Sequence, residues 1–194
     1  MIDMKPVKKL ARRKYDSVEF FKFAKDKEER YELINGQIRM MASPTVIHQD
    51  IAGYIYRKLG DFLEGKTCRA FIAPLDVVLF FDEKDKDRAQ NVFQPDVFVV
   101  CDPGKISGKR ICGAPDFVAE IVSESSETND YLRKFAIYMS CGVKEYWIIN
   151  PETKEIMAYT NTEEKEEAKR HTFADKIKIG IFGDFEIDFN QMKI

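Results

Sequence analysis

Two acidic residues stand inside apolar segments of the sequence. Asp96 begins the run Asp-Val-Phe-Val-Val, and Glu120 lies within Phe-Val-Ala-Glu-Ile-Val at 117–122. A carboxylate in a covered strand costs several kcal/mol unless it is paired, neutralised or bound to a cation. If the two segments are neighbouring strands, their acids converge at one end of a sheet. A hard divalent cation then explains most simply how two mutually repelling carboxylates are held together.

A structural interpretation of both acids stays open. Asp96 follows Pro95 and can accept backbone hydrogen bonds at the start of a strand, while Glu120 can pair with a single lysine or arginine. Asp116 also follows a proline and stands closer to the start of its segment. We therefore expect Asp116 to serve the strand rather than a site.

Lys134 has two interpretations of its own. It lies four residues after Asp130 in a segment that is helical in pattern, so one interpretation is an exposed pair worth a few tenths of a kcal/mol. The other turns the lysine toward the carboxylates of the preceding strand. There an ammonium group can orient water and offset the charge of a phosphorane-like transition state.

The N-terminal half predicts two helices separated by a hairpin. Ser17 is a capping residue for a short amphipathic helix that ends near Lys27. The pair Asn35-Gly36, between two apolar segments, favours a type I′ turn. A longer helix begins at 43–45, and its apolar residues recur every four positions. We expect these residues to face the core: Ile47, Ile51, Ile55, Leu59 and Leu63.

The central part of the chain predicts buried strands followed by a helix. Segment 71–81 reads as one strand leading into a charged loop, and 97–101 and 117–122 read as central strands covered on both faces. A helix begins at Thr128 and is ended by Gly142. Four residues are expected on its apolar side: Leu132, Phe135, Ala136 and Met139.

The last third predicts mainly strands. Segments 145–149 and 156–159 form a second hairpin, 163–170 is a helical turn or a loop, and 176–181 is a late strand. The passage 117–149 is a right-handed crossover if its two strands are parallel neighbours. The order of elements predicts an α/β fold with a mixed sheet, in a single domain whose residues 1–15 form a basic arm.

Composition excludes several classes of protein. Thirty-one Lys and Arg against 33 Asp and Glu give a net charge of −2, so any nucleic-acid site must be local. Two histidines argue against a multi-histidine zinc site. The four cysteines lack C-x-x-C spacing and are expected to be free thiols in a reducing compartment. With neither a membrane-length apolar run nor a signal peptide, the sequence predicts a cytoplasmic protein.

Short motifs follow one another along the chain in a specific order. They are Tyr-Glu-Leu-Ile-Asn-Gly-Gln-Ile at 31–38, Ser-Pro at 43–44 with His48, Pro95-Asp96, Pro-Asp-Phe-Val-Ala-Glu-Ile-Val-Ser at 115–123, Asp-x-x-x-Lys-x-x-x-Tyr at 130–138 and Gly-Val-Lys-Glu-Tyr-Trp at 142–147. Between about 17 and 159, their order and spacing resemble the Uma family of restriction endonucleases. That family is part of the PD-(D/E)XK nuclease superfamily.

The resemblance implies a restriction-endonuclease-like fold, with a mixed central β-sheet flanked by α-helices. It implies Asp96 as the motif aspartate and Glu120 as the motif acid, both holding Mg²⁺ or Mn²⁺. Val122 occupies the position of the motif lysine. The resemblance implies that Lys134 on the next helix replaces that lysine.

Two residues inside these motifs have open roles. Glu32 is either a further acid of the site or a solvent-facing strand residue. His48 is one position off the apolar stripe, so it either contacts a phosphate or holds Glu32, or else caps or packs its helix. Tyr138 is expected in the core.

These features predict a metal-dependent endonuclease that hydrolyses DNA phosphodiester bonds. The catalytic candidates are Asp96, Glu120, Lys134, Glu32 and His48. One alternative is a module of the same fold that binds nucleic acid or protein without cutting it. Another is a purely structural ion pair between Glu120 and Lys134. Homodimerisation is also expected, because duplex cutting commonly needs two sites.

Overall fold

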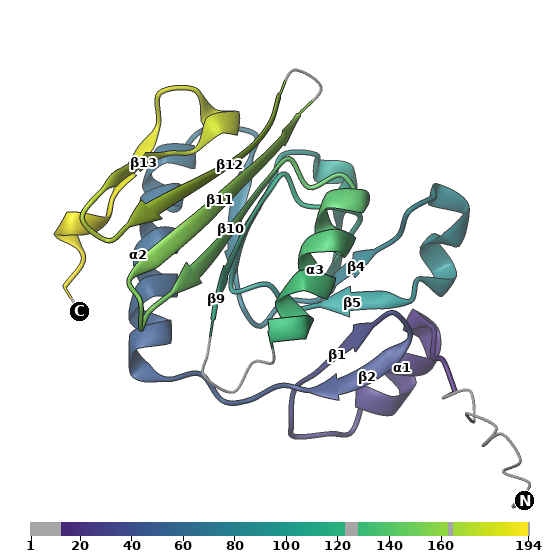
Figure 1. Ribbon diagram of the computed structural model, residues 1–194. Helices are drawn as coiled ribbons and strands as arrows, with labels where there is room; N and C mark the ends of the chain where they lie inside the picture. Colours follow the sequence, from purple (N-terminus) through teal and green to yellow (C-terminus); the bar gives the residue numbers. More distant parts are fainter. Residues whose placement is uncertain (1–12, 123–127, 163–164, 194) are drawn as a thin grey trace, which may run out of the picture.

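The computed structural model describes residues 13–122, 128–162 and 165–193. Their strands form two six-stranded sheets and one two-stranded sheet (Figure 1). None of the helices in these stretches has both the length and the apolarity that a membrane span requires. Most of the expected basic arm, residues 1–12, lies outside the described residues.

The central sheet has the strand order β12-β11-β10-β9-β6-β3 and is mixed. Only the β9–β10 pair in it is parallel, and the other neighbours are antiparallel. Its strands are β3 (Arg69–Ile72), β6 (Val97–Val100), β9 (Phe117–Ile121), β10 (Glu145–Asn150), β11 (Glu155–Thr162) and β12 (Lys165–Thr172). The expected mixed α/β class is confirmed.

The second sheet has the order β2-β1-β5-β4-β8-β7. Its strands are β1 (Tyr31–Ile34), β2 (Gln37–Met40), β4 (Val77–Leu79), β5 (Asn91–Phe93), β7 (Ile106–Ser107) and β8 (Arg110–Cys112). The expected hairpin joins β1 to β2, with positive φ angles at Asn35 and Gly36. Three of these strands, β5, β7 and β8, are too short to show a sequence pattern.

The remaining elements are helices and a small C-terminal unit. The α-helices are α1 (Ser17–Ala24), α2 (Val46–Leu63) and α3 (Thr128–Ser140). The C-terminal pair is β13 (Lys176–Lys178) and β14 (Glu186–Asp188). Short 3₁₀ helices span Glu83–Arg88, Pro103–Lys105, Gly180–Phe182 and Phe189–Gln191.

The central sheet is covered on both faces, which explains the unbroken apolar runs of β6 and β9. Helix α2 lies on one face, while α3 and the second sheet lie on the other (Figure 1). Along β6, Val97 and Val99 pack in the cluster that contains α2, whereas Phe98 and Val100 pack in the cluster that contains α3. The same alternation places Val118 of β9 on the α3 face, and Glu120 is two residues further along that strand.

Several local expectations are wrong in detail. Segment 71–81 is two strands rather than one, because a bend at 73–74 separates β3 from β4 and the two strands join different sheets. Segment 163–170, expected as a turn or loop, contributes to strand β12 from Lys165 on. Its charged residues belong to the edge strand of the sheet, where one side of the strand has no neighbour.

Two helix expectations also need correction. The cap of α1 is Asp16 rather than Ser17, and it forms a capping box with Glu19. In α2, Ile47 is 36% exposed and so lies at the edge of the expected stripe rather than in the core. Ile51, Ile55, Leu59 and Leu63 are buried as expected.

The expected apolar side of α3 is confirmed for Phe135 and Met139, which pack against the core, and is wrong for Leu132 and Ala136. The buried apolar residues of this helix include Ile137 and Tyr138, whereas Leu132 is 63% exposed and Ala136 is exposed. The helix is turned so that the face carrying Lys134 and Tyr138, four residues apart, meets β9. Gly142 follows with a φ of 92°, as expected of a residue that ends a helix.

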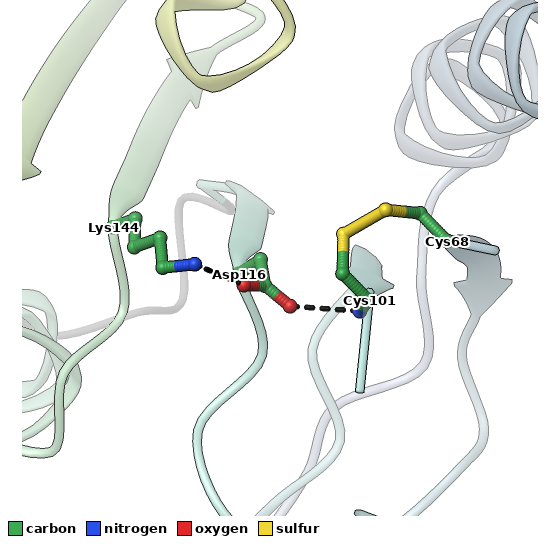
Figure 2. Close-up of a disulfide and its surroundings, with 4 residues drawn as sticks. All are labelled: Cys68, Cys101, Asp116 and Lys144. Carbon is green, nitrogen blue, oxygen red and sulfur yellow. Dashed lines mark hydrogen bonds and ion pairs between the residues drawn. A yellow bond between two sulfur atoms is a disulfide. The ribbon is translucent and has the colours of Figure 1, made fainter. Parts of the chain in front are cut away.

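A disulfide between Cys68 and Cys101 joins β3 to β6 (Figure 2). It lies at the end of β6 remote from Asp96, because Asp96 directly precedes the strand and Cys101 directly follows it. Arg69 pairs with Val100, so the next residues outward, Cys68 and Cys101, stand opposite each other. The expectation of four free thiols is therefore wrong for this pair, and it holds for Cys112 and Cys141. Strand register brings the two cysteines together, and their separation of 33 residues in sequence does not reveal it.

Asp116 fastens the same end of the sheet (Figure 2). Its Oδ2 accepts the backbone N–H of Cys101 at 2.8 Å, and its Oδ1 accepts the Nζ of Lys144 at 2.7 Å. Asp116 thus links β6, β9 and the chain entering β10. Its contacts are those of the strand-supporting residue that was expected.

Removing the disulfide is expected to lower the free energy of unfolding by about 3 kcal/mol, because a closed loop of this length restricts the unfolded chain. Urea denaturation of the Cys68→Ala/Cys101→Ala double variant measures this loss. Dithiothreitol should weaken the wild type and leave the double variant unchanged. Four alkylatable thiols in the unreduced protein would contradict the pairing.

Candidate functional site

The five candidate residues come from strands of both six-stranded sheets and from two helices, and they lie close together. Glu32 lies on β1, His48 on α2, Asp96 directly before β6, Glu120 on β9 and Lys134 on α3. Side-chain contacts join them into two groups, Glu32–Lys134–Glu120 and His48–Asp96. Residues far apart in the sequence are thus gathered at one end of β6 and β9.

Asp96 and Glu120 occupy facing positions on neighbouring strands. Val97 of β6 pairs with Ala119 of β9, and continuing that register by one residue places Asp96 opposite Glu120. Both are buried, with exposed fractions of 9% and 5%. The expected convergence of the two strand acids at one end of the sheet is therefore present.

Asp96 is held through one of its oxygens. Its Oδ2 accepts the backbone N–H of Ile121 at 2.7 Å and lies 3.1 Å from Nε2 of His48. His48 belongs to the first turn of α2, where its own N–H is capped by Thr45. The histidine therefore contacts Asp96 and not Glu32, which corrects one of its expected roles.

Lys134 points into the site rather than toward solvent. Its Nζ lies 2.8 Å from Oε1 of Glu32 and 3.3 Å from Oε1 of Glu120, and only 12% of its side chain is exposed. The interpretation of Lys134 as an exposed helix-surface residue is therefore wrong. Because α3 follows β9 in sequence and packs across it, a lysine at this position reaches the acid of the strand.

Two site contacts were not anticipated from the sequence. The hydroxyl of Tyr138 donates to Oε1 of Glu120 at 2.7 Å, so this buried residue belongs to the site as well as to the core. The backbone N–H of Gln94 donates to Oε1 of Glu32 at 3.0 Å. A signal for Tyr138 existed in its four-residue spacing from Lys134, which puts both on one helix face. The Gln94 contact depends on β1 and β5 being neighbours, which no motif indicated.

The site carries more negative than positive charge. Burial raises the pKa of Glu120 to about 7, with help from the carboxylates of Asp96 and Glu32 and against the opposing effects of Lys134 and Tyr138. Burial works to lower the pKa of Lys134, but Glu120 and Glu32 outweigh it and raise that pKa. Glu32 and Glu120 thus share the ammonium group of Lys134, while Asp96 pairs with His48.

The pKa of His48 is raised as well. Burial works to lower it, but the hydrogen bond and the charge of Asp96 outweigh that effect. The Nδ1 atom of His48 is buried and has no hydrogen-bond partner among the described residues.

The raised pKa of Glu120 predicts a pH dependence of stability. Between pH 4.5 and about 7 the folded protein keeps a proton that the unfolded chain releases, so stability falls as the pH rises. The contribution is on the order of 3 kcal/mol. Glu120→Gln should lack this pH dependence. In urea denaturation with chelator, the free energy of unfolding of the variant should therefore rise relative to that of the wild type between pH 5 and pH 8. Parallel curves would contradict the shift.

Comparisons with known proteins address the fold and the family. The model of the Uma2 family, described as "Putative restriction endonuclease", matches residues 17–189. An uncharacterized protein of Synechocystis sp. is 25% identical over 142 residues, which cover 73% of this chain and 71% of that protein.

A crystal structure from Anabaena variabilis, described as a "putative nuclease belonging to DUF820", aligns with a TM-score of 0.73 and 17% identity over 91% of this chain and 96% of that one. The two proteins share the fold. The resemblance drawn from the sequence motifs is confirmed as well, because the family model spans most of the chain. The protein belongs to the Uma2 family of restriction endonuclease-like proteins.

Proposed function

We propose that the protein hydrolyses phosphodiester bonds of DNA with the help of a divalent cation. The observation that carries this proposal is the facing placement of Asp96 and Glu120 on β6 and β9, with the Nζ of Lys134 at 3.3 Å from Glu120. Family membership supports the nuclease class. The cation, the DNA substrate and the role of each side chain are part of the proposal.

The donor set fits a hard cation. The contacts that described residues make to the two acids fall on Oδ2 of Asp96 and Oε1 of Glu120, so one oxygen of each carboxylate receives no contact from them. Carboxylate oxygens are the ligands that Mg²⁺ and Mn²⁺ prefer. When Glu32, Asp96 and Glu120 are ionised beside Lys134 and His48, a divalent cation also offsets the excess negative charge.

The cation must draw further ligands from elsewhere. In the described part of the chain, no group of three or more His, Cys, Asp or Glu side chains is arranged to hold a metal ion. Two carboxylates completed by water, substrate phosphate and a backbone carbonyl near Ile121 are a usual Mg²⁺ arrangement. Asp96 and Glu120 are therefore the proposed ligands. When bound, the cation polarises a phosphoryl oxygen and increases the acidity of a coordinated water.

Lys134 takes the part that the motif lysine plays in the wider superfamily. Val122 stands in the usual lysine position, but α3 brings the ammonium of Lys134 to Glu120 and Glu32. From there it can orient the attacking water and offset charge that develops on the phosphoryl group. Tyr138 and His48 hold Glu120 and Asp96 in orientation.

Plasmid cleavage tests the proposal. The wild type should nick or linearise supercoiled DNA in Mg²⁺ or Mn²⁺ and should leave it intact in chelator. Asp96→Ala should be inactive under all conditions. If wild type and variant leave identical bands, cleavage is not the chemistry of this protein, and the non-cutting binding module becomes the better account.

A further inference from the structure

The hairpin β1–β2 carries two arginines on the same face as Glu32. Glu32 pairs directly with Arg39, so their side chains stand on one face of the hairpin. The N–H of Met41 donates to the carbonyl oxygen of Arg30 at 2.8 Å, which extends the ladder by one pair. Arg30 is two residues before Glu32 and therefore lies on that same face.

This face of the hairpin is the one that meets the site. Glu32 accepts Lys134 and the N–H of Gln94 there, whereas Leu33 on the opposite face packs with Phe20 of α1. Arg30 and Arg39 therefore lie on the face of the hairpin that brings Glu32 to the site.

Arg30 and Arg39 form no ion pair with an acidic side chain in the described part of the chain. The ion pairs of the site among the described residues join Lys134 to two glutamates and His48 to Asp96. Both arginines are half-buried, so solvent and a ligand can still reach them. A half-buried guanidinium without an acidic partner offers a planar pair of donors that suits a phosphate group.

A polyanionic substrate needs such groups here. The site has three acidic side chains against Lys134 and His48, and the whole chain has a net charge of −2, so no strong long-range attraction brings a nucleic-acid backbone to it. Local cations must supply binding. Diagonal neighbours across a hairpin lie about 7–8 Å apart, so the two guanidiniums can contact separate phosphates.

Resting on the proposed nuclease function, we propose that Arg30 and Arg39 bind the sugar–phosphate backbone of the nucleic acid next to the bond that is cut. They are positioning residues for the substrate strand. Each contact is with phosphate, so it is independent of base sequence.

Fluorescence anisotropy with a labelled 30-base-pair duplex, on a Glu120→Gln background that prevents cutting, tests this assignment. Adding Arg30→Ala and Arg39→Ala together should weaken binding at least about tenfold, and the slope of log Kd against log salt should fall by about 2. Arg57→Ala removes one charge from an exposed position on α2 and should change Kd less than twofold. Arg30→Lys/Arg39→Lys should restore the salt slope.

The outcomes separate the two proposals. One outcome is that the wild type cuts DNA and the Glu120→Gln protein binds it, but the two alanine substitutions leave Kd and the salt slope unchanged. In that case the phosphate assignment is overturned and the nuclease proposal stands. If the alanine pair lowers the melting temperature and the lysine pair restores it without any change in salt slope, the arginines are structural, which also overturns the assignment. A wild type that neither binds nor cuts DNA overturns both.

In the cutting-competent protein, the alanine pair should raise KM and leave kcat within a few-fold. Phosphate contacts away from the reacting atoms stabilise bound substrate and transition state alike. A fall in kcat with unchanged KM would contradict a role in substrate binding.

Discussion

Lys134→Met is expected to lower the free energy of unfolding by about 3–5 kcal/mol at pH 8, the largest loss of any single substitution considered for this protein. The substitution leaves Glu32 and Glu120 buried and close together without the ammonium group that they share. At this pH, above the pKa of about 7 for Glu120, the carboxylate must either stay charged in the core or take up a proton at a cost. Urea denaturation in chelator measures the loss.

Lys144→Met is the matched control for this experiment. Lys144 also pairs with a buried acid, Asp116, at 2.7 Å, but its own side chain is 55% exposed. An exposed partner contributes little, so we expect a loss of about 1 kcal/mol or less. Equal losses for the two variants would mean that Lys134 stabilises the protein no more than an exposed lysine does, which would contradict the prediction.

Lys134→Met should also abolish cleavage. A positioned proton-transfer or charge-stabilising group contributes about 100-fold or more to rate, and methionine keeps the length of the side chain without its charge. Single-turnover cleavage in Mn²⁺, at a temperature where the variant is folded, measures the effect. A variant that is destabilised but still cuts at the wild-type rate would support the purely structural ion pair.

Loss of either strand acid is expected to weaken Mn²⁺ binding about 100-fold. Glu120→Gln and Asp96→Asn keep the size of each side chain and remove one of two charged ligands. Tyr138 and Lys134 still have an oxygen to contact in Glu120→Gln, so the fold is preserved. Isothermal titration calorimetry on the folded proteins gives the affinities.

Asp116→Asn provides the control for metal binding. Asp116 is a buried aspartate at the opposite end of β9, tied to Cys101 and Lys144, and its substitution should leave Mn²⁺ affinity unchanged. If all three variants bind Mn²⁺ as the wild type does, the two strand acids do not hold the cation. The protein would then be better described as a binding module.

The sequence predicts the elements that carry the site because each has a strong local signal. Asn35-Gly36 fixes the β1–β2 hairpin, and the four-residue apolar recurrence identifies α2. Asp96 and Glu120 stand out because a charge interrupts a run that is otherwise apolar. These signals are local, and each depends on only a few neighbouring residues.

Features that depend on strand neighbours could not be predicted in the same way. The Cys68–Cys101 disulfide follows from the β3–β6 register, and the Gln94–Glu32 bond follows from β1 lying beside β5. The His48–Asp96 contact likewise requires the first turn of α2 to reach the start of β6. No sequence spacing encodes these distances. Homodimerisation remains a prediction.

A crystal soaked in Mn²⁺ gives the most direct test of the central claim, that Asp96 and Glu120 together hold one divalent cation beside Lys134. We expect an anomalous difference peak within about 2.5 Å of a carboxylate oxygen from each acid. A map with no peak between these two side chains at saturating Mn²⁺, or with peaks only elsewhere on the protein, would contradict the claim.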